Sequence, residues 1–405
     1  MTTTERETEL PDFPIPRGCP FAAPPIYDQL RTESPISRVR MRDGESAWLL
    51  TRHEDVRAVL SDPRFSANKA APGFPVFMAG QKEGLAQHSP FLVNMDGDAH
   101  TAARRPLISE FSTRRINLLR PRIQQIVDEL IDRMLTLPRP LDLVGELALP
   151  IPSSVIAELV GVSDDDFEFF QQITVKGVRR ETTDQQQENI AIALRDFMTK
   201  LVEEKEVEPG DDLVSRQISQ QRAMRDDVDR SGLVSMAILM LIAGHETTAN
   251  MISLGVYTLL SNPDQLAAMA AAPDKVPAAV EELLRYYSII DFGPPRLALE
   301  DVEVGGVLIK AGEGVIASGF AAGRDGEIFA DPEKFDIDRD ARLHVAFGYG
   351  AHQCLGQNLA RAELQITLET LFRRIPELRL AADPSELRFK SDALVYGLHE
   401  LPVTW

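Results

Sequence analysis

Residues 347–356 read FGYGAHQCLG and lead directly into QNLARAELQITLETLF, an apolar stretch with helical spacing. Three glycines in this short segment permit a tight backbone path that other residues would resist. Cys354 stands near the end of the path, just before the expected helix. The positive end of the helix dipole and the free N–H groups there lower the pKa of a thiol. The segment therefore predicts a cysteine that is suited to bind a metal.

Three other interpretations of this segment compete. Its Gly-x-Gly pattern could begin a dinucleotide-binding fingerprint, but the third glycine would fall on Gln353 and no βαβ unit surrounds it. A zinc site needs about four nitrogen or sulphur ligands, whereas Cys354, His352 and His344 supply three and the other cysteine is remote. An inert buried cysteine requires nothing further, and for a cysteine considered alone it is the simplest interpretation.

The composition restricts the class of protein. The 405-residue chain is 44% hydrophobic with a net charge of −19, which suits a large core and argues against a DNA-wrapping protein. Cys19 and Cys354 form no disulfide framework, which favours a reducing compartment. The N-terminus is polar and lacks the apolar core of a signal peptide. No window offers about 18 uncharged apolar residues in a row, so we expect a cytoplasmic protein.

Length alone favours two or three domains, but no linker, low-complexity tract or repeat divides the chain. The longest expected helix covers residues 231–260, and its first half, SGLVSMAILMLIAG, is apolar almost all round. Such a helix must be buried, and at about 1.5 Å per residue it is roughly 45 Å long, enough to cross a whole domain. We therefore expect residues 1–405 to form a single large domain.

Helical spacing of apolar residues recurs along the rest of the chain. Further helices are expected at residues 26–32, 54–61, 114–136, 153–160 and 187–205. Strands are expected at residues 47–51 and at residues 301–309, with a turn at Gly305–Gly306. The pattern predicts a mainly α protein with small β-sheets near the N-terminus and after residue 290.

The segment around Cys354 also matches the haem-binding signature of the cytochrome P-450 superfamily at every fixed position, namely Phe347, Gly348, Gly350, His352, Cys354 and Gly356. The chain resembles this family from about residue 11 to its last residue, Trp405. The resemblance implies the cytochrome P-450 fold, with the long helix over a haem b cofactor and Cys354 as the iron ligand. It also implies that Phe347, Gly348, Gly356 and Ala243 contact the haem.

The middle of the long helix reads Ala-Gly-His-Glu-Thr-Thr at residues 243–248. A glycine and two threonines are locally unfavourable in an apolar helix. A threonine hydroxyl can bond back to the preceding turn and open the helix. The plain alternative is a polar notch that contacts another helix. The segment resembles the family's oxygen-activation motif, which implies that Glu246 and Thr247 relay protons as the catalytic pair.

Two further sets of residues agree with the family. Glu282 and Arg285 share a helix face at i, i+3, which on a surface helix would contribute little. The resemblance instead implies a buried structural triad completed by Arg339. A haem also carries two propionates, which need cationic or hydrogen-bonding partners. The resemblance assigns that role to four residues that would otherwise be solvated surface side chains, namely His100, Arg104, Arg296 and His344.

The relatives implied by the resemblance are actinobacterial cytochromes P-450 that hydroxylate macrolides, other polyketides, sterol-like molecules and xenobiotics. It implies a monooxygenase that hydroxylates or epoxidises a bulky hydrophobic molecule with dioxygen. Because the chain ends about 50 residues after Cys354, the electrons should come from a separate ferredoxin and its reductase. The alternative is a haem-thiolate protein that only binds ligand, or that catalyses ring coupling or dehydration. The Glu246–Thr247 pair favours the monooxygenase.

The resemblance also indicates the partner surfaces and the pocket. We expect a monomer with a basic patch for an acidic ferredoxin at Arg105, Arg114, Arg342 and Arg361, unless these are ordinary solvated arginines. Asp291 and Arg179 are expected polar anchors for substrate, and residues 64–93 are either a mobile lid or an ordered loop. The expected pocket is apolar, as suits a hydrophobic substrate. Its members are Phe74, Phe77, Leu92, Val93, Leu239, Ala243, Ile289, Ile290, Phe292 and Val395.

Overall fold

The computed structural model describes residues 10–19, 21–77, 92–163, 166–169, 184–224, 227–290, 293–391, 393 and 395–405. Three expected pocket residues, Arg179, Asp291 and Phe292, lie outside the described residues. The same holds for most of the second half of the expected lid, residues 78–91.

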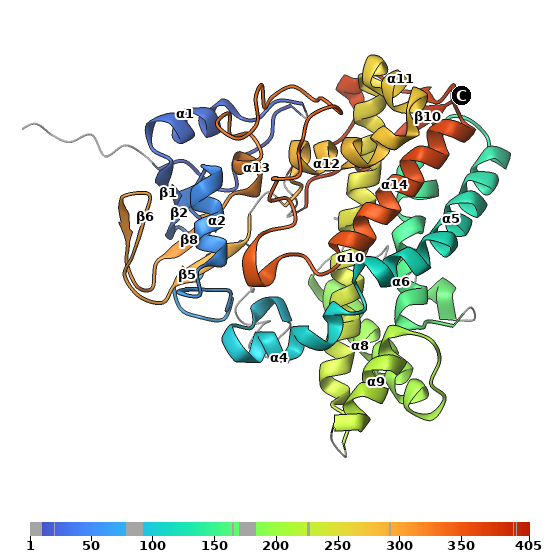
Figure 1. Cartoon of the computed structure of the whole chain (residues 1–405), viewed down its shortest axis with the longest axis horizontal. Helices are drawn as coiled ribbons and strands as arrows, with labels where there is room; N and C mark the ends of the chain where they lie inside the picture. Colours follow the sequence, from blue (N-terminus) through green and yellow to red (C-terminus); the bar gives the residue numbers. More distant parts are fainter. Residues whose placement is uncertain are drawn as a thin grey trace, which may run out of the picture.

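Helices form most of the molecule, and the expected ones are confirmed to within a few residues (Figure 1). A serine or aspartate begins two of the long ones, since Ser112 accepts a hydrogen bond from the Arg115 N–H and Asp229 accepts one from the Gly232 N–H. The α-helices are α1 (Pro25–Glu33), α2 (His53–Ser61), α4 (Gly97–Ile108), α5 (Thr113–Thr136), α6 (Pro150–Val160), α8 (Asp184–Val207), α9 (Leu213–Met224), α10 (Arg230–Ser261), α11 (Pro263–Ala271), α12 (Val276–Tyr287), α13 (Gly319–Ala322) and α14 (Gln357–Arg374).

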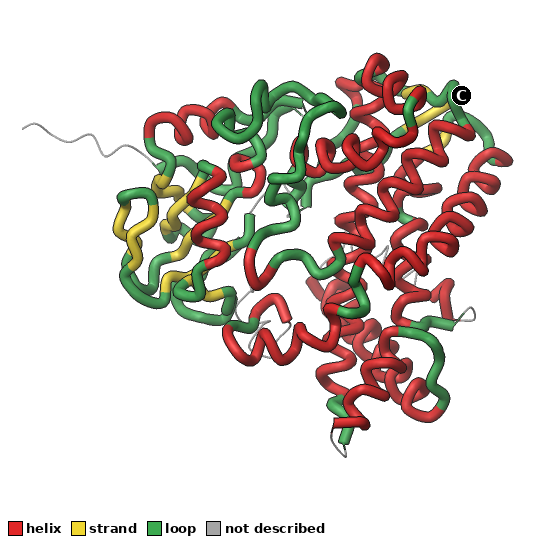
Figure 2. The backbone as a smooth tube through the Cα atoms, in the orientation of Figure 1, coloured by secondary structure: helices red, strands yellow, loops and turns green. Residues whose placement is uncertain are grey.

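Most strands gather at one end of the molecule, beside α1 and α2 (Figure 2). The largest sheet has the order β1-β2-β8-β5-β3, in which β2 and β8 are parallel and the other pairs antiparallel. A second sheet has the order β4-β10-β9, and β6 with β7 forms a hairpin. The strands are β1 (Ile36–Arg40), β2 (Ser46–Leu50), β3 (Phe65–Ser66), β4 (Leu141–Asp142), β5 (Pro295–Ala298), β6 (Val302–Val304), β7 (Val307–Ile309), β8 (Gly314–Ala317), β9 (Arg379–Leu380) and β10 (Pro402–Thr404).

Both expected strand segments are confirmed. The segment at residues 47–51 forms most of β2, and the segment at residues 301–309 forms the β6–β7 hairpin. Its turn uses Gly305 and Gly306, both with positive φ, 52° and 80°, a region that favours glycine.

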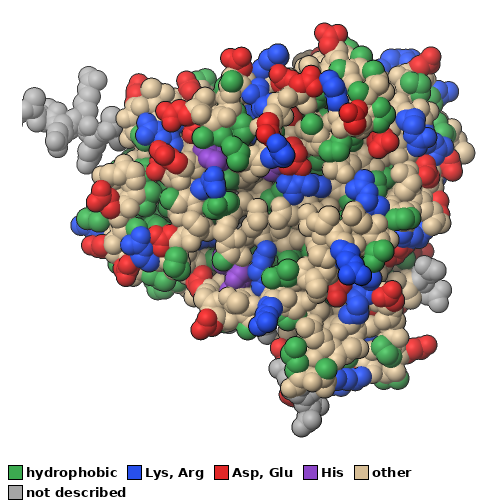
Figure 3. Space-filling view, in the orientation of Figure 1, with side chains coloured by type: hydrophobic (Ala, Val, Ile, Leu, Met, Phe, Trp, Pro, Cys, Tyr) green, Lys and Arg blue, Asp and Glu red, His purple; other side chains and the backbone are tan. Residues whose placement is uncertain are grey.

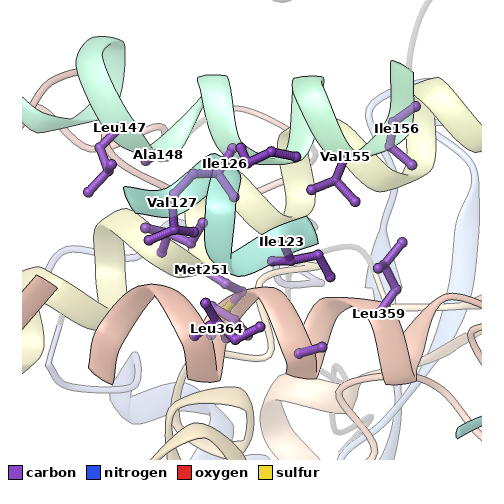
Figure 4. Close-up of a cluster of buried hydrophobic side chains, with 14 of the residues drawn as sticks. Ile123, Ile126, Val127, Leu147, Ala148, Val155, Ile156, Met251, Leu359 and Leu364 are labelled. Atoms are coloured by element: carbon purple, nitrogen blue, oxygen red, sulfur yellow. The ribbon is translucent and has the colours of Figure 1, made fainter. Parts of the chain in front are cut away.

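Helix α10 runs through the helical part of the molecule and packs against α6, α8 and α14 (Figure 1). A Cβ at Gly244 would lie 2.8 Å from Ile156 Cδ1, so this glycine permits the close approach of α6. In Figure 4, Ile123 and Ile126 of α5 and Met251 of α10 point into the same core. By length and composition alone α10 could cross a membrane, but half of its most apolar window is buried and core helices of soluble proteins share this property. The expectation of a long central helix is confirmed, and its burial is confirmed except along one face in its middle.

Candidate active site

The loop before α14 holds Cys354 in a defined backbone path. The Cys354 N–H donates to the Phe347 carbonyl at 2.8 Å, which closes the loop on itself. Gly348 and Gly350 have φ of 70° and 71°, in the left-handed region that favours glycine. A Cβ at Gly350 would also lie 2.4 Å from the Leu60 carbonyl oxygen of α2. The loop therefore needs its glycines both for conformation and for contact with α2.

Cys354 lies just before α14, where the residue keeps some solvent-accessible surface although protein atoms surround its sulphur. The protein atoms around the sulphur raise the pKa of the thiol, while the Gly356 and Gln357 N–H groups and the charge of Arg104 lower it. The net shift is upward, so the expectation of a lowered pKa is wrong. The physical reason is that desolvation by the surrounding protein outweighs the helix-terminal N–H groups. A bound metal ion deprotonates a coordinating thiol outright, which makes this shift compatible with a ligand role.

Helix α10 is buried on most sides but open along one face in its middle. Leu239 is half-buried, Ile242 is 61% exposed and Ala243 is exposed, and Thr247 follows four residues later on the same face. The Thr247 hydroxyl donates to the Ala243 carbonyl at 2.6 Å, which is the bond back to the preceding turn that the sequence suggested. The helix nevertheless continues unbroken from Arg230 to Ser261, so the expected opening is not observed.

Glu246 meets a partner that is distant in the sequence. Lys390 Nζ lies 3.1 Å from Glu246 Oε1 and 3.0 Å from Asn250 Oδ1, one turn further along α10. The preceding residue, His245, is buried, and burial together with the charge of Lys390 lowers its pKa to about 4. His245 is therefore neutral at neutral pH. No short-range pattern connects Lys390 with α10, which is why sequence reasoning missed it.

His100 and Arg104 of α4 lie beside the Cys354 loop. Arg104 Nη2 donates to the Gln353 carbonyl at 2.5 Å. The His100 ring packs against that of His352, with centroids 4.1 Å apart. Burial lowers the pKa of His100, and the charge of Arg104 lowers it further.

Two more cations complete this cluster. Burial lowers the pKa of Arg296 to about 10. Burial, followed by the charge of Arg296, lowers the pKa of both Lys69 and His352, the latter to about 4. Asp96 is the acid that opposes these shifts at His100, Arg296 and His352. These basic groups destabilise one another's charged forms, so an additional anion placed among them would be strongly favoured.

His344 contacts other protein groups, and its expected contact with a propionate stays a prediction. Its Nε2 lies 3.1 Å from Glu281 Oε2, and its Nδ1 accepts from the Ala346 N–H at 3.1 Å, so both ring nitrogens have a protein partner. His352, which the prediction did not include, packs against His100 and lies close enough to Arg296 and Arg104 for their charges to lower its pKa. The sequence carried the signal for His352, because it is the histidine of the signature two residues before Cys354.

Glu281 is the centre of a separate network on the Cys354 side. Arg361 of α14 binds it through two nitrogens, at 2.6 and 3.0 Å. Burial would raise the pKa of Glu281, but hydrogen bonds from His344 and Arg361 lower it to about 2. The Arg361 guanidinium also lies over the Phe347 ring, 4.6 Å from its centroid. Arg361 is thus occupied in holding the loop, which weakens the expectation that it contributes to a partner surface.

The structure brings Glu282, Arg285 and Arg339 together. Arg285 Nε and Nη2 each lie 2.7 Å from one Glu282 oxygen, and both side chains are fully buried. Arg339 Nε donates to Glu282 Oε1 at 3.2 Å. Arg285 Nη1 also donates to the Gly323 and Pro332 carbonyls at 2.7 and 2.9 Å. The triad therefore joins α12 to the segment that leads to the Cys354 loop.

Some expected pocket residues are brought together and others are not. Ile290 forms an isolated β-bridge with Val395, and the Tyr396 N–H donates to the Ile289 carbonyl at 2.8 Å. Leu92 and Leu239 are both partly buried against the main core, while Val93 is 42% exposed and Phe74 only 2%.

Phe77 is a correction to the expected pocket. It is 4% exposed in a core beside the large sheet, with its ring edge-on to Phe13 at 6.3 Å. It therefore stabilises that core instead of lining a pocket. Ile242 was missed, although it lies three residues after Leu239 on the open face of α10.

These residues fit a haem with its two propionates. His100 Nε2 is buried and has no hydrogen-bond partner among the described residues, so it can serve one carboxylate. Arg104 and Arg296 supply the positive charge that two carboxylates need, while the neutral rings of His100 and His352 can donate hydrogen bonds. A cysteine sulphur, an exposed apolar helix face and a cationic cluster together define a haem-binding oxidoreductase site.

Comparison with known proteins identifies the family. The cytochrome P450 family model matches residues 136–375, more than half of the chain. The crystal structure of cytochrome P450 MoxA from Nonomuraea recticatena has a TM-score of 0.94 and 54% identity, covering 97% of this chain and 98% of that one. Pentalenic acid synthase of Streptomyces avermitilis is 48% identical over 97% of each chain. Vitamin D3 dihydroxylase of Streptomyces griseolus is 44% identical over 100% of this chain and 99% of its own.

The chain belongs to the cytochrome P450 family. It is a P450 monooxygenase with the P450 fold and haem b as its cofactor, so these three expectations are confirmed.

Proposed function

We propose that this P450 inserts one oxygen atom from dioxygen into a bulky hydrophobic small molecule, by hydroxylation or epoxidation. The observation that carries the proposal is the open apolar face of α10, in which Leu239, Ile242 and Ala243 lead to Thr247 on a helix whose other apolar residues are mostly buried. An apolar face that ends in a hydroxyl suits a greasy molecule held beside a proton-transfer group.

We propose Cys354 as the iron ligand. Haem b, when bound, supplies the one-electron chemistry that activates dioxygen. The protein contributes the position of the sulphur, which the hydrogen bond from the Cys354 N–H to the Phe347 carbonyl supports. His100, Arg104, Arg296 and His352 would bind the propionates.

Glu246 and Thr247 are proposed to hold and transfer protons beside the substrate. Thr247 presents its hydroxyl oxygen on the open face while its hydrogen is donated to the Ala243 carbonyl. A hydroxyl in this position can accept a proton or hydrogen bond from a water and pass on its own proton. Glu246 lies next to it, partly buried and fixed by Lys390.

The substrate class rests on the relatives and on the apolar lining. The names of two relatives refer to pentalenic acid and vitamin D3. The open face of α10 and the bridge between Ile290 and Val395 provide hydrophobic contacts and few polar ones. We therefore propose a terpenoid-, sterol- or polyketide-like substrate.

Electrons are proposed to arrive from a separate acidic ferredoxin, itself reduced by a ferredoxin reductase. Figure 3 shows Lys and Arg side chains over the face formed by α4, α5 and α14. Arg105 of α4 and Arg114 of α5 are exposed and have no ion-pair partner among the described residues. Arg342 is also exposed but pairs with Asp340 at 2.8 Å.

We also propose that residues 1–405 act as one domain and as a cytoplasmic monomer. The main apolar core supports a single domain, since it runs from Leu107 to Val403. The two cysteines are unpaired, which agrees with a reducing compartment. Size-exclusion chromatography and coincident unfolding transitions by two probes would check the oligomeric state and the single domain.

The test of the function combines spectroscopy and product analysis. The reduced, carbon monoxide-bound holoprotein should show the red-shifted absorption band of thiolate ligation, and Cys354→Ala should abolish it. A panel of terpenoids, sterols and macrolides should include compounds that shift the haem spectrum. With surrogate redox partners, such compounds should yield product with one added oxygen. Retention of the red-shifted band in Cys354→Ala would refute the ligand assignment.

A further inference from the structure

A hairpin near the C-terminus brings Lys390 to the middle of α10. Phe389 and Leu398 form an isolated antiparallel bridge, and the Lys390 N–H donates to the Gly397 carbonyl at 2.8 Å. This bond orients the backbone of Lys390 so that its side chain can extend to α10. Lys390 therefore reaches Glu246 from an element other than α10.

The ammonium group of Lys390 binds two acceptors on successive turns of α10. Its Nζ lies 3.1 Å from Glu246 Oε1 and 3.0 Å from Asn250 Oδ1. The side chains of Lys390 and Glu246 are 13% and 23% exposed, so the pair is largely screened from water. A partly desolvated carboxylate needs a charged or hydrogen-bonding partner, and Lys390 supplies both.

Gly397 makes this approach possible. A Cβ at Gly397 would lie 2.2 Å from Asn250 Oδ1 and 2.3 Å from Asn250 Cγ. Real atoms never come so close, so a side chain at residue 397 would force the hairpin and Asn250 apart. The close contact between the hairpin and α10 therefore depends on glycine at residue 397.

The neighbouring His245 adds no positive charge beside the Lys390–Glu246 pair. His245 is neutral at neutral pH, because burial and the charge of Lys390 lower its pKa to about 4. The Glu246 carboxylate thus faces the Lys390 ammonium without competition from the neighbouring imidazole. Glu246 is also the residue directly before Thr247, whose hydroxyl bonds to the Ala243 carbonyl.

We propose that Lys390 is a positioning residue for oxygen activation, which fixes the Glu246 carboxylate beside Thr247 through its contacts with Glu246 and Asn250. This inference rests on the proposed proton-transfer role of Glu246 and Thr247. With Lys390 in place, the carboxylate has one anchored position. Without Lys390, the Glu246 carboxylate can turn toward water, and proton transfer to Thr247 becomes slower.

The first arm of the test measures coupling in the holoenzyme with surrogate redox partners. Lys390→Met should lower the product formed per NADPH by about tenfold and raise hydrogen peroxide, as expected when a proton-transfer group is displaced. It should also change the solvent deuterium isotope effect, while the carbon monoxide band and substrate affinity stay unchanged. Lys390→Arg should restore most of the coupling. Lys275→Met is the matched control, since Lys275 pairs with Asp338 at 2.8 Å on the surface.

The second arm tests the pair itself by a double-mutant cycle on unfolding. Lys390→Met should raise the unfolding equilibrium constant about tenfold in the parent and much less in Glu246→Gln. Additive effects would overturn the pairing. Parent-like coupling and isotope effect in Lys390→Met would overturn the positioning role, even if stability falls. If instead the parent itself oxygenates no compound of the panel, the proposed function fails, whatever the variants show.

Discussion

Glu363 of α14 is a carboxyl group placed in the core. It is 1% exposed, and its Oε2 has no hydrogen-bond partner among the described residues. Burial raises its pKa to about 8, from an ordinary value near 4.5. The folded protein therefore binds this proton more tightly than the unfolded chain does. The resulting stabilisation is fully present below pH 4.5 and is lost as the pH rises through about 8.

Glu363→Gln keeps the size of the side chain and removes the ionisation. We expect the variant to gain stability relative to the parent between pH 5.5 and pH 8, by on the order of 2–4 kcal/mol. Urea unfolding of the holoprotein across this range measures the change. Glu369→Gln is the control, because Glu369 is exposed on the same helix. Parallel pH profiles for Glu363→Gln and the parent would contradict a buried proton at Glu363.

Substitutions of His100 and His344 should differ in their effect on haem retention. His100 has a free buried nitrogen, whereas both nitrogens of His344 are used by the protein. His100→Ala should accelerate haem transfer to apomyoglobin about tenfold, which corresponds to the loss of one charge-assisted hydrogen bond. His344→Ala should change this rate much less, although it should lower stability. Equal rates for the two variants would contradict the assignment.

At the scale of elements, the triad that joins α12 to the segment before the Cys354 loop depends on charge balance. Glu282 neutralises Arg285, and both are fully buried. Glu282→Gln would leave a buried guanidinium without a counter-ion. We expect a loss of about 3–5 kcal/mol in the free energy of unfolding, measured by urea denaturation.

A matched surface pair shows what the burial contributes. Arg388 and Glu400 lie 3.1 Å apart, with side chains 73% and 46% exposed. Glu400→Gln should cost less than about 1 kcal/mol. An equal loss of unfolding free energy in both variants would contradict the idea that burial makes the triad important for stability.

Element-scale expectations agree well with the structure because they rest on local rules. Apolar spacing and helix ends located α1, α2, α5, α6, α8 and α10 to within a few residues. Gly305 and Gly306 marked the β6–β7 turn because few other residues adopt positive φ. The long helix at residues 231–260 was expected, but the local opening at Thr247 is not observed. Packing against α6, α8 and α14 holds α10 regular through its polar centre.

At the scale of the whole molecule, charge distribution governs the encounter with a redox partner. The chain has a net charge of −19 and repels an acidic ferredoxin except where its cations are unpaired. Arg105 and Arg114 offer such charges, whereas Arg361 is bound to Glu281. The surface that binds the ferredoxin is therefore expected to be smaller than the predicted patch of four arginines.

The double variant Arg105→Glu/Arg114→Glu should slow reduction by an acidic ferredoxin about tenfold at low ionic strength. The difference from the parent should shrink as salt rises, since salt screens charges of this kind. Stopped-flow reduction at several salt concentrations measures both effects. Arg42→Glu, an exposed charge reversal in the turn between β1 and β2, is the control. Salt-independent rates would refute electrostatic docking at this face.

The sequence by itself determined the helices, the glycine-dependent loop and the set of residues that resemble the P-450 signature. Each of these depends on neighbours within one or two turns of chain, where spacing and backbone conformation are readable. Only the tertiary structure decided that His352 joins the cationic cluster, that Phe77 belongs to a core, and that Lys390 reaches Glu246. These choices depend on contacts between segments far apart in the chain, and on desolvation that no local pattern encodes.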